Sequence, residues 1–299
     1  MTVDGRRSER AKPVEPLQVV RLQGTGSSVV RDEVVGEEPL EIRVEGPGWA
    51  AVTVGVTMRT PGHDFELATG FLFSEGHLRG RDAVATVRYC EAVQGEQQRY
   101  NVVTVTSRSP VPVQSRRLST TITSSCGVCG TTSLDELLAR CSPPSPTTVI
   151  GAPVLYGLPE RLRAEQRIFD RTGGLHAAGL FDCETGTPIA VREDIGRHNA
   201  VDKLLGWGAL GGRLPLSHCA LVVSGRVSFE IVQKAAIAGI PVLAAVSAPS
   251  SLAVETARRL RMTLAAFVRE DRANVYSAPQ RIVLAPEGTL EGREEPAHR

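Results

Sequence analysis

Residues 220–268 read ALVVSGRVSFEIVQKAAIAGIPVLAAVSAPSSLAVETARRLRMTLAAFV, and this stretch decides the fold. Short apolar runs of the kind found in strands buried on both faces alternate with segments long enough for helices. The runs are Ala220–Val223, Pro241–Val246 and Leu264–Val268, and the helical segments are Phe229–Ala238 and Ser251–Leu260. Strands joined through helices pair in parallel by right-handed crossovers. The stretch therefore predicts an α/β fold with a mostly parallel sheet covered by helices.

The same alternation begins near residue 150. Strands are expected at Ala178–Phe181 and Pro188–Val191, and helices at Pro159–Arg171, closed by Gly173, and at Arg197–Leu205. We therefore expect an α/β domain over residues 149–285. Three prolines in Ser142–Thr148 mark its N-terminal boundary, because they exclude a helix or a central strand there.

The first half of the chain has the period of two that half-buried strands show. Apolar and polar residues alternate in Pro39–Glu45, Trp49–Met58 and Tyr100–Thr106. These segments predict a β-rich N-terminal region over residues 17–141. Residues 1–16 and 286–299 are polar or charged and are expected to be disordered tails.

Two helices are expected within this β-rich region. The first has Thr60 as its cap and Pro61 at its first position, and Gly76 follows its end. The second begins at Ser133, where Ser-Leu-Asp-Glu forms a capping box with Glu136.

Composition and charge exclude several classes of protein. The 299 residues carry a net charge of +1, which argues against a nucleic-acid-binding role. No apolar run reaches the ~18 residues of a membrane-spanning helix, and the N-terminus lacks the apolar core of a secretory signal. Six cysteines are sparse for a disulfide scaffold of this length. We therefore expect a cytoplasmic protein with reduced thiols and no membrane partner.

Polar residues directly follow four of the expected strands. The junctions are Asp194–Asn199 (DIGRHN), Ser224–Ser228 (SGRVS), Ser247–Ser251 (SAPSS) and Arg269–Arg272 (REDR). The carboxyl ends of parallel strands meet at one edge of a sheet, where helix N-termini offer free N–H groups to anions. Serine and glycine are ordinary turn residues, but four such junctions together indicate a pocket for an anionic, phosphorylated ligand. Arg226, Arg269 and Arg272 would supply charged donors to its phosphates.

Residues 124–130 (SSCGVCG) place the thiols of Cys126 and Cys129 three residues apart between glycines. The motif alone leaves four interpretations open: half of a zinc site, a dithiol redox centre, a persulfide carrier, or two inert cysteines. No second cysteine or histidine pair has zinc-ligand spacing, which weighs against zinc. A redox CxxC usually begins a helix directly, whereas residues 130–132 intervene here before the expected helix.

The remaining cysteines and the histidines are weaker signals. Two histidines are the better candidates for polar site residues: His176, after a pair of glycines, and His198, beside Arg197. A zinc-dependent nucleobase deaminase needs an H-x-E motif with its cysteine pair, and no histidine of this chain has a glutamate two positions later. The scattered cysteines are expected to be small buried residues; they are Cys90, Cys141, Cys183 and Cys219.

Several longer motifs support a family resemblance. They are MRTPG (58–62), ELATGFLFSEG (66–76), CGVCG (126–130), GGLHAA (173–178), EDIGRHNAVDK (193–203), SGRVSFE (224–230), AAVSAPSSLA (244–253) and FVR (267–269). Their sequences and order, along roughly residues 17–285, resemble the FdhD family of formate-dehydrogenase accessory proteins, which are bacterial and archaeal sulfur carriers. Motifs of this length are far more specific than a CxxC alone.

The resemblance implies both a fold and a function. The fold would be a cytidine-deaminase-like α/β structure, preceded by the β-rich region, that has lost the deaminase chemistry. The protein would be a sulfurtransferase that accepts sulfur from a cysteine desulfurase as a cysteine persulfide. It would pass this sulfur to the bis-molybdopterin guanine dinucleotide form of the molybdenum cofactor before the cofactor enters formate dehydrogenase. The resemblance also implies a homodimer.

The resemblance further implies roles for individual residues. Cys126 would carry the persulfide, and Cys129 would be the second cysteine of the catalytic motif. The cofactor would bind at Phe267, Val268, Arg269, Glu270, Asp271 and Arg272, and its guanine nucleotide, which GDP mimics, supplies the phosphates expected at the strand ends. From the neighbouring junctions we add Ser224, Gly225, Arg226, Ser247 and His198. No intrinsic metal is expected.

Two other functions remain open. One is a chaperone that binds the molybdenum cofactor without covalent sulfur transfer, for which both cysteines would be dispensable. The other is a zinc-dependent, deaminase-like protein, for which the purified protein would contain zinc.

Overall fold

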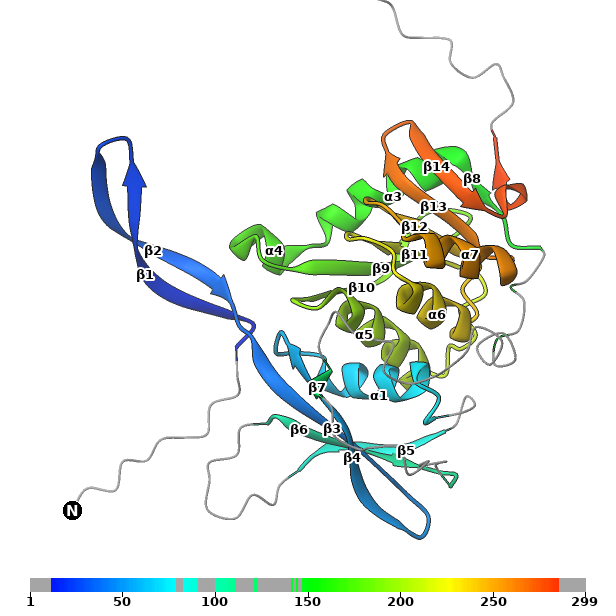
Figure 1. The fold of residues 1–299 in the computed structure, drawn as a ribbon, viewed down its shortest axis with the longest axis horizontal. Helices are drawn as coiled ribbons and strands as arrows, with labels where there is room; N and C mark the ends of the chain where they lie inside the picture. Colours follow the sequence, from blue (N-terminus) through cyan, green and yellow to red (C-terminus); the bar gives the residue numbers. More distant parts are fainter. Residues whose placement is uncertain are drawn as a thin grey trace, which may run out of the picture.

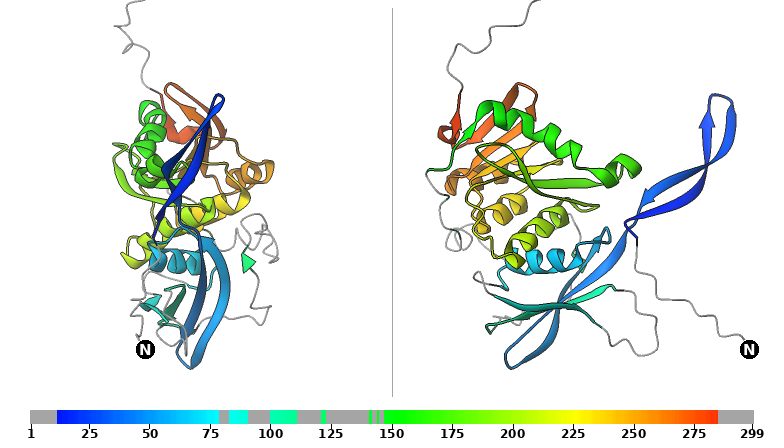
Figure 2. Two further views of the ribbon diagram at one scale, coloured as in Figure 1. Left: turned by 90° about the vertical axis from the view of Figure 1, so that its left-hand side faces the viewer. Right: turned by 180° about the vertical axis from the view of Figure 1, so that it is seen from behind.

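The computed structural model describes residues 12–78, 83–90, 100–110, 121–122, 141, 144 and 147–284. In these residues a six-stranded sheet with helices on both faces stacks on a smaller sheet, and a long hairpin projects from the body (Figures 1 and 2). None of the helices in the described ranges is both long and apolar enough to span a bilayer.

The larger sheet has the strand order β10-β9-β11-β12-β13-β14. Its strands are β9 (His176–Asp182), β10 (Pro188–Asp194), β11 (Cys219–Val223), β12 (Val242–Ala245), β13 (Thr263–Arg269) and β14 (Arg272–Ser277). Only β11–β12 and β12–β13 pair in parallel, and the other three neighbouring pairs are antiparallel. The sheet is therefore mixed, which corrects the expectation of a mostly parallel one. The reason is that the consecutive strands β9–β10 and β13–β14 form hairpins at its two edges.

Helices cover both faces of this sheet. One face carries α5 (Arg197–Leu210), α6 (Phe229–Ile237) and α7 (Ser251–Arg259), and the other carries α3 (Ala152–Ala164), followed by α4 (Arg167–Thr172). Side chains alternate along β11: Leu221 belongs to the core beneath α5–α7, and Val222 to the core beneath α3. Burial on both faces explains why the central strands are apolar throughout.

The α3–α4 pair replaces the single helix expected at Pro159–Arg171. α3 begins at Ala152 and holds Pro159 in its interior, and the chain leaves the helical conformation at Gln166 before α4 starts. Gly173 ends α4 in the left-handed conformation (φ 66°), as the sequence predicts for a terminal glycine.

The smaller sheet has the order β5-β6-β3-β4-β7. Its strands are β3 (Glu38–Gly46), β4 (Trp49–Arg59), β5 (Val84–Tyr89), β6 (Val102–Ser107) and β7 (Thr121–Ile122). α1 (Asp64–Ser74) lies between this sheet and α5, and its residues Leu67 and Leu72 pack on Ile42 and Val103. The β-rich N-terminal region is thus joined to the larger sheet through a helix–helix contact.

The predicted start of α1 is wrong by several residues. The helix begins at Asp64, after His63 in the left-handed conformation (φ 57°), and Thr60 does not cap it. Thr60 instead bonds to the α/β part of the chain: its N–H donates to Asp194 Oδ2 (3.2 Å), and its hydroxyl accepts from the Ile195 N–H (3.1 Å). A long-range partner has replaced the local capping role.

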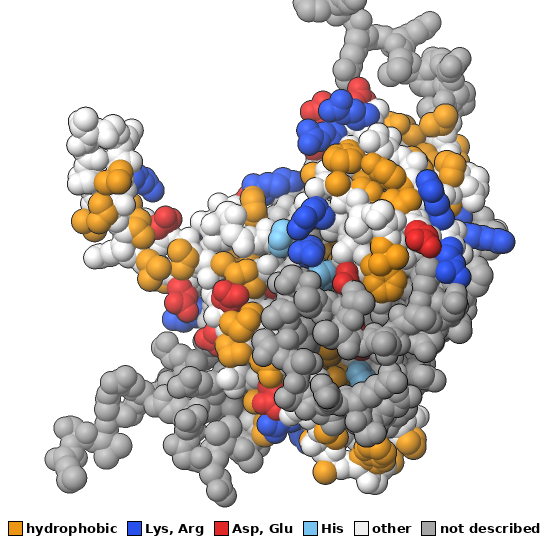
Figure 3. Space-filling model, in the orientation of Figure 1, with side chains coloured by type: hydrophobic (Ala, Val, Ile, Leu, Met, Phe, Trp, Pro, Cys, Tyr) orange, Lys and Arg blue, Asp and Glu red, His pale blue; other side chains and the backbone are white. Residues whose placement is uncertain are grey.

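The projecting hairpin consists of β1 (Val14–Gln23) and β2 (Gly26–Val35). It begins within the segment that the sequence assigns to a disordered tail, so that expectation is corrected for residues 14–16. Several of its apolar side chains face solvent, with Val20 64%, Leu22 77% and Val29 68% exposed (Figure 3). At the other end of the body, β8 (Ile150–Gly151) pairs with β15 (Ile282–Val283), next to a short 3-10 helix at Pro279–Arg281.

Candidate functional site

Four strands of the larger sheet run in one direction. β10 and β11 are both antiparallel to β9, and β12 and β13 follow β11 in parallel. Their carboxyl ends therefore share one edge of the sheet with the first residues of β9 and β14. This edge brings together the four junctions that the sequence singled out. The last junction is the turn of the β13–β14 hairpin, however, and not the start of a helix as expected.

Hydrogen bonds connect these junctions to one another. The Ser224 hydroxyl accepts from the Ala177 N–H (2.9 Å), and the Ser224 N–H donates to the Ala177 carbonyl (3.0 Å). The Val227 N–H donates to the Ala248 carbonyl (3.1 Å), and the Ser250 N–H donates to the Val227 carbonyl (2.9 Å). The loops after β11 and β12 and the start of β9 thus form one connected wall.

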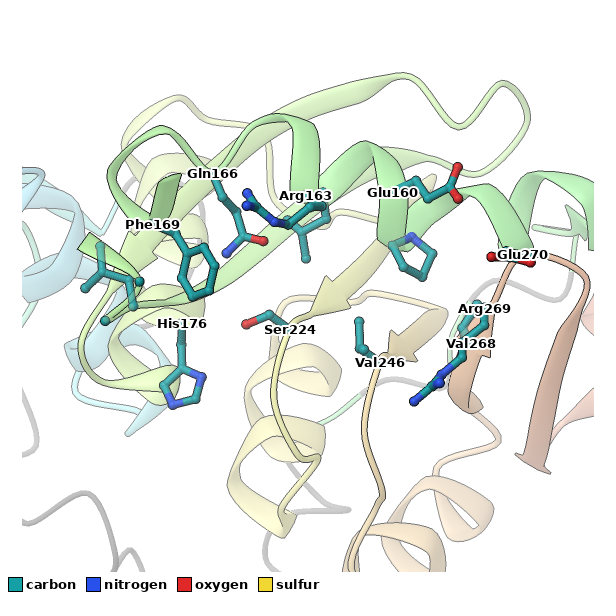
Figure 4. Close-up of a pocket in the computed structure, with 15 residues that line it drawn as sticks. Glu160, Arg163, Gln166, Phe169, His176, Ser224, Val246, Val268, Arg269 and Glu270 are labelled. Atoms are coloured by element: carbon teal, nitrogen blue, oxygen red, sulfur yellow. The ribbon is translucent and has the colours of Figure 1, made fainter. Parts of the chain in front are cut away.

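A cavity of about 760 Å³ lies between this wall and the α3–α4 helices (Figure 4). Gln166, Phe169 and His176 line one end of it, Arg269 and Glu270 line the other, and Ser224 and Val246 lie between them. A volume of roughly 300–1,000 Å³ with a mostly apolar lining and a few polar groups is typical of small-molecule sites. The cavity is therefore a candidate binding site.

The predicted cofactor-binding residues occupy different places around this cavity. Of these, Ser224, Val268, Arg269 and Glu270 line it. The others are not part of its wall, although they belong to the β13–β14 hairpin, the adjacent loops or α5: Phe267, Asp271, Arg272, Gly225, Arg226, Ser247 and His198. The predicted catalytic residues Cys126 and Cys129 lie outside the described residues.

His176, Gly225 and Arg197 form a compact cluster next to the cavity. A Cβ atom at Gly225 would lie 3.3 Å from His176 Nδ1, which is a tight contact, and 3.8 Å from Arg197 Cδ, which is an ordinary one. Burial lowers the pKa of His176, and the charge of Arg197 lowers it further. Within the described part of the chain, the buried Nε of Arg197 has no hydrogen-bond partner.

His198 lies in the first turn of α5 and faces the start of α6. Its Nε2 is 3.1 Å from the Ser228 hydroxyl at the start of α6. Burial lowers the pKa of His198 to about 4, with further contributions from the charges of Arg197 and Lys234. His198 is therefore neutral near pH 7, and it can position Ser228 but does not offer a positive charge to a phosphate.

Two of the four scattered cysteines are buried, as predicted, whereas Cys90 and Cys141 are only partly buried, which corrects the prediction for those two. Cys183 and Cys219 are 3% and 6% exposed. Burial raises the pKa of Cys183 to about 12 and that of Cys219 to about 11, so neither forms a reactive thiolate near neutral pH. Across the described ranges, no three His, Cys, Asp or Glu side chains are grouped closely enough to hold a metal ion.

A sequence model of the FdhD/NarQ family matches residues 35–283. The chain belongs to the FdhD/NarQ family. It is 50% identical over 276 residues to the sulfur carrier protein FdhD of Nocardia farcinica, across 91% of this chain and 96% of that protein. It is 52% identical over 266 residues to the sulfur carrier protein FdhD of Mycolicibacterium paratuberculosis, across 86% and 94% of the two chains.

The fold of this FdhD/NarQ chain also matches a solved structure. A Desulfotalea psychrophila protein described as a formate dehydrogenase accessory protein superposes with a TM-score of 0.69 at 24% identity, over 90% of this chain and 99% of that one. An α/β fold preceded by a β-rich region is therefore confirmed, and its likeness to cytidine deaminases stays a prediction.

The cavity also contains residues that the sequence reasoning missed. Arg163, Gln166 and Phe169 line it from the α3–α4 segment, which the sequence suggested was a single covering helix. The only signal was their position just before the GGLHAA motif, which carries His176.

Proposed function

We propose that this FdhD/NarQ protein is a cytoplasmic sulfur carrier. It accepts sulfur from a cysteine desulfurase as a persulfide on Cys126. It then transfers the sulfur to the bis-molybdopterin guanine dinucleotide form of the molybdenum cofactor, which is destined for formate dehydrogenase. The observation that carries the proposal is the 50% identity to the sulfur carrier protein of N. farcinica along nearly the whole of both chains.

The chemistry of the first step balances without an added oxidant. The Cys126 thiolate attacks the terminal sulfur of the desulfurase persulfide, a new S–S bond forms, and the desulfurase cysteine leaves as a thiolate. In the second step that S–S bond breaks and the terminal sulfur becomes a sulfide ligand of the molybdenum. The metal supplies the two electrons, and Cys126 is regenerated as a thiolate.

The strand-end cavity supports cofactor binding because it offers an unpaired cation. The Arg269 side chain lines the cavity and forms no hydrogen bond or ion pair with the described residues. Arg226 and Arg272 lie in the adjoining junctions. Guanidinium groups make charge-assisted hydrogen bonds to phosphate, each worth about 1.5–3 kcal/mol.

Covalent sulfur loading is tested by intact-protein mass spectrometry after incubation with a cysteine desulfurase and cysteine. We expect a mass increase of one sulfur atom in the wild type and in Cys129→Ser, and none in Cys126→Ser. Formate dehydrogenase maturation should follow the same order. Full maturation activity in a variant lacking both cysteines would replace the proposal with a non-covalent chaperone.

Cofactor binding is tested by calorimetry with GDP as the probe. Arg269→Ala should weaken GDP binding about tenfold, since 1.4 kcal/mol corresponds to one decade in affinity. Arg43→Ala is the matched control, because Arg43 pairs with Glu41 in the smaller sheet. Unchanged GDP affinity in Ala variants of Arg226, Arg269 and Arg272 would refute the placement of the phosphates.

The proposal includes a homodimer, for which the β1–β2 hairpin is the supporting feature. An isolated two-stranded hairpin is marginally stable in water, and this one exposes Val20, Leu22 and Val29. A second copy of the chain covering these residues would stabilise it. Light scattering should show a dimer for the wild type and a monomer for Leu22→Asp/Val29→Asp. A monomeric wild type would contradict this part of the proposal.

A further inference from the structure

Gln166 has a buried side chain that does not form a hydrogen bond with the helix it precedes, α4. It occupies the N-cap position of α4 and is only 4% exposed, yet its carboxamide makes no capping hydrogen bond. The Glu193 carboxylate does this instead, by accepting from the N–H groups of Ile168 (2.9 Å) and Phe169 (2.8 Å). The α4 N-terminus is thus satisfied without Gln166, whose carboxamide forms no hydrogen bond with another side chain or backbone group of the described residues.

The carboxamide of Gln166 points into the cavity, on the side where Phe169 also lies (Figure 4). The Arg163 guanidinium lies 4.9 Å from the centroid of the Phe169 ring, and Arg163 is itself paired with Asp170. One end of the cavity thus combines an aromatic ring with an adjacent hydrogen-bond donor and acceptor. Arg269 lines the opposite end.

A buried amide without a partner costs free energy, and water in the cavity can satisfy it in the free protein. A ligand replaces that water without loss only if it supplies one acceptor and one donor in the same plane. A lactam edge does so, because its carbonyl accepts from the carboxamide N–H and its ring N–H donates to the carboxamide oxygen. The neighbouring aromatic ring favours a flat heterocycle.

We propose that Gln166 and Phe169 form a subsite for the aminopyrimidinone edge that guanine and pterin rings share. This inference rests on the proposed function, because the dinucleotide form of the molybdenum cofactor carries both rings. The heterocyclic ring would bind at the Gln166–Phe169 end of the cavity, and the phosphates would bind at the opposite end, next to Arg269.

The decisive variant is Gln166→Met, which keeps the volume of the side chain and removes its hydrogen-bonding groups. The matched control is Gln233→Met, because Gln233 is a buried glutamine of α6 (8% exposed) that does not line the cavity. Calorimetry would use GDP, free pterin and inorganic pyrophosphate as ligands. Thermal unfolding would confirm that each variant is folded.

We expect Gln166→Met to weaken GDP or pterin binding about tenfold and to leave pyrophosphate binding unchanged. If Gln166→Met loses affinity for GDP alone, the subsite binds guanine. If it loses affinity for pterin alone, the subsite binds the pterin ring. If it loses affinity for both ligands, the subsite accepts either ring. Phe169→Leu should weaken the same ligands, because it removes stacking but stays apolar.

Three results would overturn the inference. If Gln166→Met binds GDP and pterin like the wild type while Arg269→Ala loses GDP affinity, the subsite is wrong but the proposed function stands. If Gln166→Met weakens the binding of GDP and of pyrophosphate equally, Gln166 does not recognise the ring of the ligand. If the wild type binds neither GDP nor pterin, the subsite and the proposed cofactor binding fail together.

Discussion

The central strands of the larger sheet and the contact between α1 and α5 bury their residues in different ways. Every residue of β11 and β12 is buried, and all are apolar. At the α1–α5 contact, α5 instead carries two charged residues in ion pairs whose side chains are at most 6% exposed: Asp202 with Lys234 of α6 (2.8 Å) and Lys203 with Asp194 of β10 (2.7 Å). The Ser74 hydroxyl of α1 also donates to Asp202 (3.0 Å). An apolar core accepts any residue of suitable volume, whereas a buried charge is tolerated only with its own partner. The α1–α5 contact is therefore the more specific of the two.

The same contact also requires glycine at two positions. A Cβ atom at Gly206 of α5 would overlap the carbonyl oxygen of Glu66, and a Cβ atom at Gly70 of α1 would overlap the carbonyl oxygen of Asp202. The two helix backbones therefore touch directly. This contact joins the β-rich region to the sheet that carries the cavity, so its specificity fixes how the two parts of the chain fit together.

The largest loss of stability is expected from removing the partner of a buried charge. Asp202→Leu leaves the buried Lys234 ammonium with the Ser74 hydroxyl (2.8 Å) and the half-exposed Glu75 carboxylate (3.7 Å), and should lower the free energy of unfolding by about 3–5 kcal/mol. Urea denaturation would measure this loss. The double variant Asp202→Leu/Lys234→Met should recover most of it, because no unpaired charge remains. If the double variant is as unstable as the single one, the pair is not what makes this contact specific.

A somewhat smaller loss of stability is expected when the pH is lowered. Burial opposes ionisation of Glu66, but hydrogen bonds from Arg192 (2.6 and 2.8 Å) and His63 outweigh it and lower its pKa from 4.5 to about 2. Because the folded-state pKa is the lower one, this interaction stabilises the protein fully above pH 4.5 and is lost as the pH falls toward 2. At 1.36 kcal/mol per pKa unit its contribution near neutral pH is roughly 3 kcal/mol.

Chemical denaturation across this pH range compares the two regions directly. The difference in unfolding free energy between the wild type and Glu66→Gln should shrink between about pH 5 and about pH 2. Leu221→Ala, in β11, should cost about 2–5 kcal/mol at every pH, because it removes only apolar contacts. A pH-independent difference for Glu66→Gln would show that its ion pair with Arg192 does not stabilise the fold.

The smallest effect is expected from adding one methyl group to α5. Gly206→Ala should destabilise the protein by about 1–3 kcal/mol, because the new methyl group meets backbone atoms that cannot move aside. Gly208→Ala, two residues further along α5, is the control: its Cβ would lie 3.4 Å from a Leu214 side-chain atom, an ordinary contact. We expect Gly208→Ala to be neutral or stabilising, since alanine favours a helix by about 1 kcal/mol over glycine. Equal thermal midpoints for the two variants would contradict the close backbone approach.

Local pattern predicted the strands and helices of the α/β part well, because a strand buried on both faces can hold only apolar residues. It failed where a distant partner overrode a local preference. Thr60 has the chemistry of a helix cap, yet it bonds to Asp194 and Ile195. Gln166 lies at a helix start, yet Glu193 provides the capping hydrogen bonds. In both cases the deciding contact joins residues more than twenty positions apart, beyond the reach of any local pattern.

The sequence by itself determined the α/β class, the polar junctions at the strand ends and the membership of the FdhD/NarQ family, because these depend on the order and type of neighbouring residues. Only the tertiary structure decided that hairpins at both edges make the sheet mixed, that α3–α4 close a cavity over the strand ends, and that Gln166 faces into it. The physical reason is that a polar group is free to bind a ligand only if no other group of the folded chain has already formed a hydrogen bond with it. That property belongs to the packed chain, and no single segment carries it.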